Sequence, residues 1–146
     1  MRASWIALAA VAALLVAAVA FGRQPAHVLA LAAPSFALLA TNLSVIGRFA
    51  AGPAGSLVFG MDRQVAKWGY LLIAIVAYAW LVLTVANDWL PQKSAAAALT
   101  VALSFPAGRD LIEYADDPES LAPAVKRSLI AALVHGVVLA IALAFF

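Results

Sequence analysis

The 146-residue chain is 66% hydrophobic and 11% charged, and its formal net charge is only +2. Soluble globular domains are roughly half apolar and about a quarter charged, so a soluble fold of this length has too little polar surface to cover so many apolar side chains. The composition predicts an integral membrane protein. The lack of a basic run argues against a nucleic-acid partner. Cysteine is absent, which excludes disulfides, thiol catalysis and cysteine-ligated metals.

Five apolar segments follow one another along the chain, and each is about long enough to cross a hydrocarbon core, which takes roughly 20 helical residues. The third is the most distinct, because Trp68 and Trp89 frame it as interfacial aromatic residues do. We therefore predict an all-α, polytopic membrane helix bundle that forms a single domain over residues 1–146. The expected spans are residues 4–21, 27–46, 68–89, 91–112 and 128–146.

Two of these spans have competing interpretations. The first follows Arg2 and contains Ala18-Val19-Ala20, which also fits the cleavage site of a secretory signal peptide. The fourth has a purely apolar part of only 12 residues, 94–105, before Pro106. It is either a kinked helix that continues to Ile112 or a half-span that turns back. Either alternative would leave four complete spans.

The placement of basic residues decides between these topologies. With five full spans, seven Lys and Arg residues lie on one side and only two, Arg23 and Lys93, on the other. A half-span at the fourth segment would change this split to four against five. Because cytoplasmic loops are enriched in Lys and Arg, we expect five spans with the N-terminus inside and the C-terminus outside. The predicted location is the cell (inner, cytoplasmic) membrane, as a multi-pass protein.

Residues 106–127 form a polar stretch that holds five of the seven acidic residues. If the fourth helix continues, Asp110, Glu113 and Asp117 recur at i, i+3 and i+7 and share one face. Three such carboxylates are candidate ligands for a hard cation such as magnesium. Lys126 and Arg127, at the start of the last span, are candidates for contact with anionic lipid head groups. The more common role of exposed charges is a solvated surface, and that interpretation stays open.

Residues 108–119 resemble the second acidic motif of the membrane aromatic prenyltransferases, in which acidic residues recur at helical spacing after an arginine–acid pair. The resemblance implies a magnesium-dependent membrane enzyme that acts on a lipid-linked (prenyl) phosphate. A first motif rich in Asn and Asp is missing, since residues 47–67 offer only Asp62. The chain is also much shorter than members of that family.

Four polar or aromatic side chains inside the spans are the remaining candidates: His135, Asn42, Tyr78 and Trp80. An ionisable group in the middle of a span is costly, which makes His135 a functional candidate by default. A bis-histidine haem would need a second histidine at similar depth, and His27 lies at the edge of its span. For all four residues, hydrogen bonding between helices is the more common role.

No catalytic constellation such as Gly-x-Ser-x-Gly or His-Glu-x-x-His occurs. The sequence therefore favours a non-enzyme: a non-catalytic integral membrane subunit, accessory or scaffold, of a larger membrane complex. Its expected partners are the lipid bilayer and other membrane chains, in a homo- or hetero-oligomer. The alternatives are a small oligomeric transporter or channel and the magnesium-dependent enzyme. No cofactor is required, and magnesium or haem belongs only to the minority interpretations.

Overall fold

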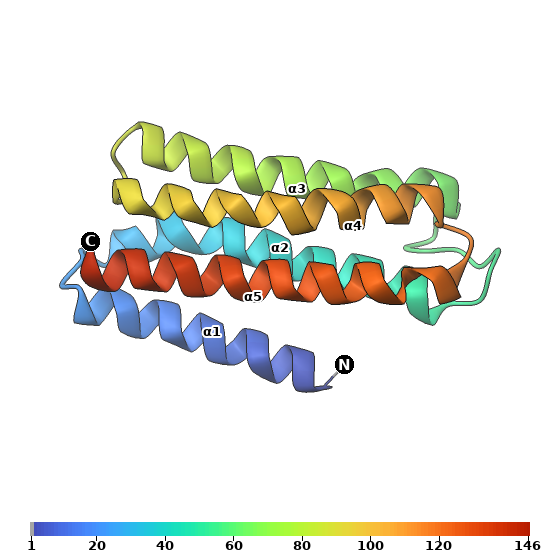
Figure 1. Ribbon diagram of the computed structural model, residues 1–146, viewed down its shortest axis with the longest axis horizontal. Helices are drawn as coiled ribbons and strands as arrows, with labels where there is room; N and C mark the ends of the chain where they lie inside the picture. The colour runs from blue at the N-terminus through green and yellow to red at the C-terminus, as the bar shows by residue number, and fades with distance from the viewer. Residues whose placement is uncertain (1) are drawn as a thin grey trace.

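The computed structural model describes residues 2–146 as five helical rods joined by short connections (Figure 1). Two rods begin with a 3₁₀ segment, η1 or η2. In chain order, the elements are α1 (Arg2–Phe21), α2 (His27–Ala51), α3 (Arg63–Ala86), η1 (Gln92–Thr100) continuing as α4 (Val101–Glu113), and η2 (Pro118–Leu121) continuing as α5 (Ala122–Phe145). Successive rods run in opposite directions, which is the arrangement that short connections impose on neighbouring helices.

Five helices are long and apolar enough to cross a membrane. The fourth, Gln92–Glu113, has 22 residues and continues through Pro106. Nine residues at the 3₁₀ rise and thirteen at the α rise give a length of roughly 37 Å, enough for a hydrocarbon core of about 30 Å. The predicted continuation of the fourth helix through Pro106 is confirmed, and the half-span that turns back after Phe105 is wrong.

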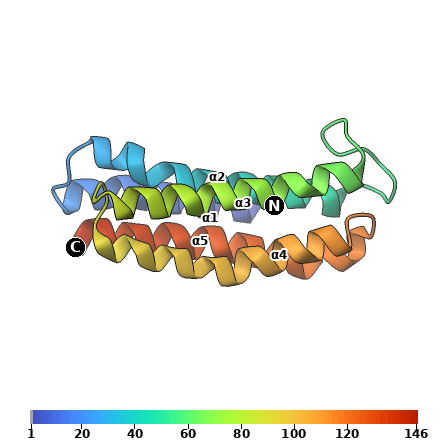
Figure 2. The same ribbon diagram turned by 90° about the horizontal axis from the view of Figure 1, so that it is seen from above.

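The four rods α2, α3, η1–α4 and α5 form a closed ring in which each contacts the next. Seen from above, α4 and α5 form one layer, with α2 and α3 in the other (Figure 2). Helix α1 lies outside this ring and packs mainly on α5, with a smaller contact to α2. The ring therefore encloses the core, and α1 is an added outer helix.

Gly136, at the middle of α5, allows α1 and α2 to approach α5 closely. A Cβ atom built on Gly136 would lie 2.3 Å from a side-chain carbon of Val11 in α1 and 2.8 Å from the ring of Phe36 in α2. Only a residue without a side chain fits there, so α1 and α2 both reach the backbone of α5. This is the small-residue packing expected between membrane helices.

The two ends of the bundle differ in character (Figure 1). The loop end contains the α2–α3 loop, residues 52–62, and the α4–α5 connection, residues 114–117. The turn end contains the short turns at residues 22–26 and 87–91 and the C-terminus. The alternation of the rods directs most basic residues toward the loop end and leaves Arg23 and Lys93 at the turn end. This matches the predicted separation of charge, while the orientation in a membrane stays a prediction.

Candidate functional site

The centre of the ring holds a buried polar cluster to which all four rods contribute. Its members are at most 8% exposed. They are Ser35 from α2, Tyr78 from α3, Thr100 and Ser104 from the η1–α4 rod, and His135 from α5. We call these five residues the His135 cluster. Sequence reasoning selected His135 and Tyr78 but assigned no such role to Thr100 or Ser104.

The two shortest polar contacts of His135 fit the tautomer with the proton on Nδ1, and Thr100 Oγ1 lies 3.2 Å from the same nitrogen. Its Nδ1 lies 3.1 Å from the carbonyl oxygen of Ala97, and its Nε2 lies 2.8 Å from Ser35 Oγ. A carbonyl oxygen only accepts, so Nδ1 carries a proton and donates to Ala97. In the neutral imidazole, Nε2 is then an acceptor and the Ser35 hydroxyl donates to it. Both ring nitrogens are thus engaged, and an axial haem ligand at His135 would have to displace one of these partners.

The hydroxyl groups continue the network on the other side of the imidazole. Thr100 Oγ1 donates to the Ala97 carbonyl at 2.7 Å and lies 2.8 Å from the Tyr78 hydroxyl. That hydroxyl also lies 2.8 Å from Ser104 Oγ. If Tyr78 donates to Thr100 and Ser104 donates to Tyr78, each of these three hydroxyl groups has an acceptor. A fully satisfied buried network of this kind holds helices in one arrangement.

One carbonyl of η1, that of Ala97, accepts from two side chains. Because η1 is a 3₁₀-helix, the amide of Val101 donates to Ala98 and Leu99 and not to Ala97, as it would in an α-helix. Besides its place in the i→i+3 pattern of η1, the Ala97 oxygen accepts from Thr100 Oγ1 and His135 Nδ1. A nine-residue 3₁₀ segment is unusually long, and it lies where α5 presents its histidine.

A second polar layer lies about two turns closer to the loop end. Asn42 Nδ2 donates to the carbonyl of Tyr70 at 3.0 Å, which links α2 to α3. The Tyr70 hydroxyl donates to Ser128 Oγ at 2.9 Å, which links α3 to α5 across the ring. On the other side of the His135 cluster, toward the turn end, Trp80, half-buried in α3, donates to the carbonyl of Leu31 in α2 at 2.8 Å. All four predicted intramembrane candidates therefore take part in bonds between helices.

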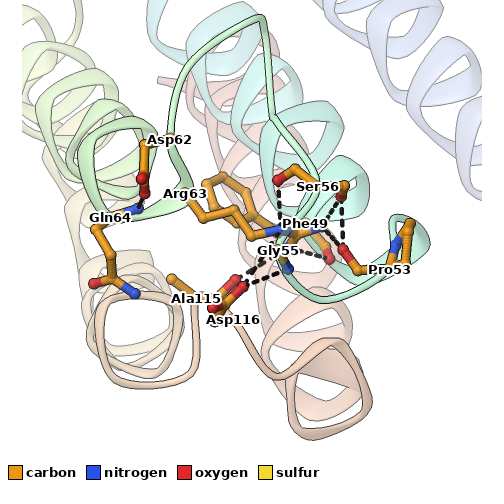
Figure 3. A network of polar contacts seen from close by, with 9 residues as sticks. All are labelled: Phe49, Pro53, Gly55, Ser56, Asp62, Arg63, Gln64, Ala115 and Asp116. Carbon is orange, nitrogen blue, oxygen red and sulfur yellow. Dashed lines mark hydrogen bonds and ion pairs between the residues drawn. The ribbon is translucent and has the colours of Figure 1, made fainter.

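The loop end is organised by Arg63, the first residue of α3, whose side chain is almost entirely buried (Figure 3). Its guanidinium donates to the backbone carbonyls of Phe49, Pro53, Ser56 and Ala115 at 2.9–3.0 Å. It also donates to Ser56 Oγ at 2.9 Å. Five donors in a rigid fork are used on three separate segments, which lysine cannot do.

Asp116 adds a carboxylate to the groups around Arg63. Its Oδ1 lies 3.9 Å from Arg63 Nε and accepts a hydrogen bond from the amide of Gly55 at 2.8 Å. The α2–α3 loop is thereby tied to the α4–α5 connection. A Cβ atom on Gly52 would lie 2.8 Å from Arg63 Nη2, so that glycine leaves room for the guanidinium. We refer to Arg63, Asp116 and the backbone groups they bind as the Arg63 clamp.

Sequence reasoning missed the Arg63 clamp because it counted Arg63 only as a positive charge. The available signal was local: Asp62 caps α3 by accepting from the amide of Gln64 at 2.8 Å, and an arginine follows this cap directly after a glycine-rich loop. The acceptors are backbone carbonyls, however, and a sequence does not reveal which carbonyls meet a given side chain.

The three predicted metal ligands are not brought together. Helix α4 ends at Glu113, so Asp117 lies beyond the helix on which a shared face was expected. Asp110 pairs with Arg127 at 2.9 Å, and Asp117 accepts from Ser120 Oγ at 2.7 Å. Within residues 2–146, no group of three His, Asp or Glu side chains is placed to hold a metal ion.

The two predicted lipid-contacting residues differ in their surroundings. Both Lys126 and Arg127 are exposed on the first turns of α5. The Arg127 side chain is 44% exposed, and its guanidinium is engaged by Asp110, which joins α4 to α5 at the loop end. Lys126 forms no ion pair within residues 2–146, and its contact with lipid stays a prediction.

These features define a class: an all-helical protein with five helices long and apolar enough to span a membrane, a buried polar cluster at its centre and a clamped loop end. Comparison with known proteins adds no family, since no protein-family model, curated protein or solved structure matches the chain. Function must therefore be argued from the sites themselves.

Proposed function

We propose that the chain is a non-catalytic integral membrane subunit, which holds a partner chain at its loop end within a larger membrane complex. The observation that carries this proposal is the Arg63 clamp. A buried guanidinium is committed to fixing the shape of two connecting segments, although such segments are usually mobile. A fixed loop surface favours recognition of a partner, because little ordering entropy is lost on binding.

The surface that the clamp supports has a definite chemistry. A hollow of about 580 Å³ lies between the C-terminal end of α2 and the α4–α5 connection. Small residues at positions 50–54 line one side of it. Three carboxylates line the other, from Asp116, Asp117 and Glu119. All three acidic residues are exposed. The hollow therefore suits a basic segment of a partner chain, and the positive-inside rule predicts that it faces the cytoplasm.

Native purification tests this proposal. The tagged chain, extracted in a mild detergent, is expected to carry a companion in stoichiometric amount. The double variant Asp117→Lys/Glu119→Lys should lose that companion, because it reverses the charge of the hollow and leaves Asp116 in the clamp. Glu113→Lys is the matched control, since Glu113 is exposed at the end of α4 and does not line the hollow. A chain that purifies alone, or a companion that both variants retain, would overturn the proposal.

A second candidate, a small oligomeric transporter or channel, is favoured by one specific observation. Within residues 2–146, two buried side-chain atoms have no hydrogen-bond partner: Asn42 Oδ1 and Ser94 Oγ. By helical rise, they lie on opposite sides of His135 along the bundle axis, Asn42 toward the loop end and Ser94 toward the turn end. Buried polar atoms of this kind are commonly satisfied by internal water, which would extend the His135 cluster in both directions.

Flux through proteoliposomes distinguishes this second function from the first. Measurable proton flux that falls in both Asn42→Ala and His135→Ala would support a pathway through the ring. Flux unchanged in both variants would remove these residues from any pathway, and absence of flux in the unmodified chain would leave only the subunit proposal.

A further inference from the structure

A groove on the outside of the ring runs between α3 and α4 near the loop end. It has a volume of about 380 Å³ and is lined by Leu71 from α3 and by Phe105, Pro106, Arg109 and Ile112 from α4. Its walls are apolar except for the Arg109 side chain, which is exposed. The groove therefore combines a hydrocarbon-like floor with a single cationic group in its lining.

A second cation, Lys67, lies at the loop end of this groove, as Arg109 does. Helix α3 begins at the loop end, so Lys67 lies one turn closer to that end than Leu71. Helix α4 finishes there, so Arg109 lies one turn closer to it than Phe105. The Lys67 ammonium donates to Gln64 Oε1 at 2.6 Å and to the carbonyl of Ile112 at 3.2 Å, and Ile112 belongs to the groove wall.

Neither cation is neutralised by a carboxylate. Within residues 2–146 the ion pairs are Arg63 with Asp116 and Arg127 with Asp110. Asp110, the acidic neighbour of Arg109 in sequence, is thus already engaged by α5. Two positive charges without counter-ions at one end of an apolar groove attract an anion that carries a hydrocarbon chain.

The aromatic residue beside Lys67 marks the depth of this site. Trp68 is 53% exposed, and the Lys67 ammonium lies 5.7 Å from the centre of its ring. Exposed tryptophans of membrane helices concentrate at the level of lipid head groups. The cations therefore lie at head-group depth, and the groove leads from them toward the middle of the helices.

We propose that this groove is a binding site for an anionic phospholipid. Lys67 and Arg109 contact the phosphate of the head group, and one acyl chain lies along Leu71 and Phe105. The site differs from the position predicted at Lys126 and Arg127, because it adds a shaped apolar groove to the basic residues. It is independent of the hollow at the loop end, which is lined by other residues.

Native mass spectrometry of the full chain in detergent tests the site with phosphatidylglycerol as the probe and phosphatidylcholine as the neutral comparison. We expect a retained phosphatidylglycerol adduct and little phosphatidylcholine. In the variant Lys67→Gln/Arg109→Gln, affinity for phosphatidylglycerol should fall by about thirtyfold, given the attraction of each of the two basic residues for anionic lipid. Arg23→Gln/Arg48→Gln removes two exposed cations outside the groove, to which no lipid contact is assigned, and should leave binding unchanged.

A steric variant separates the groove from simple charge attraction. Leu71→Trp fills the groove and keeps both cations, so it should also reduce retention of phosphatidylglycerol. Equal retention of the two lipids, or equal loss in the Arg23→Gln/Arg48→Gln control, would overturn the site. Full retention in Leu71→Trp would show that charge alone attracts the lipid and would equally overturn it. Thermal unfolding of each variant confirms that the chain tested is folded.

Discussion

Two buried side chains, His135 and Arg63, donate to backbone carbonyls of segments far away in the sequence. Hydrophobic contacts hold helices together without fixing their rotation about their own axes, whereas a donor that must meet one carbonyl does fix it. His135 acts in this way at the centre of the ring and Arg63 at the loop end. Single substitutions at these positions should therefore lower the free energy of unfolding by more than the loss of buried apolar area predicts.

Replacing Arg63 by lysine should destabilise the chain by about 2–4 kcal/mol, because an ammonium cannot reach acceptors on three segments and leaves buried carbonyls without donors. Thermal unfolding in detergent measures the change, and limited proteolysis should show faster cleavage within residues 52–62. Arg48→Lys is the control, since Arg48 is exposed and its guanidinium lies over the ring of Phe59. Equal unfolding temperatures for the two variants would contradict the role given to the clamp.

Replacing His135 by phenylalanine should cost about 1–3 kcal/mol, because Ser35 and the Ala97 carbonyl lose their partner inside the ring. His135→Asn keeps a donor and an acceptor and should cost less. Adding Ser35→Ala to His135→Phe removes the hydroxyl that has lost its partner. The double variant should therefore lose less unfolding free energy than the sum of the losses in the two single variants. A double-mutant cycle in detergent measures this coupling, and strict additivity would show that the bond contributes nothing.

At the scale of helices, apolar character indicated where the middle of each helix lies but not where the helix begins and ends. The second span was predicted to end at residue 46, and α2 continues to Ala51. The third was predicted to start at Trp68, and α3 starts at Arg63. Hydropathy marks only the part of a helix that prefers hydrocarbon, while polar residues at helix ends keep the backbone hydrogen bonds and extend beyond it.

The packing of α1 on α5 depends on Gly136, and a methyl group there tests it. Gly136→Ala should destabilise the chain by about 1–3 kcal/mol, because the new Cβ overlaps Val11 and Phe36 and pushes α1 from the ring. Gly69→Ala in α3 is the matched control, since its Cβ would meet nothing within 4 Å. That change should be neutral or stabilising by about 0.5–1 kcal/mol, given the helix propensity of alanine. Thermal unfolding compares the two, and the reverse order would disprove the close approach.

At the scale of the whole molecule, the basic residues gather toward one end of an alternating bundle. The loop end also carries the α2–α3 loop, the longest connection of the described residues, and the acidic hollow. This polarity of the molecule is the basis for predicting that the loop end faces the cytoplasm.

The lack of cysteine allows this orientation to be measured directly. Single cysteines at Ser120, in the loop end, and at Arg23, in the turn end, should react with a membrane-impermeant thiol reagent on opposite sides. In intact cells or right-side-out vesicles, Arg23→Cys should be labelled and Ser120→Cys protected; inverted vesicles should show the reverse. The unmodified chain is the blank. Labelling of both positions from one side would contradict the alternating topology.

The sequence by itself determined the class of protein, the number of helices and the separation of charge between the two ends. These properties depend on how each segment partitions between water and hydrocarbon, and the residues of the segment itself decide that partitioning. Only the tertiary structure decided which polar residues meet. Ser35 and His135 are 100 residues apart, and Arg63 binds Ala115 across 52 residues. Such contacts depend on helix rotation, on the 3₁₀ geometry of η1 and on backbone acceptors, none of which residue types reveal.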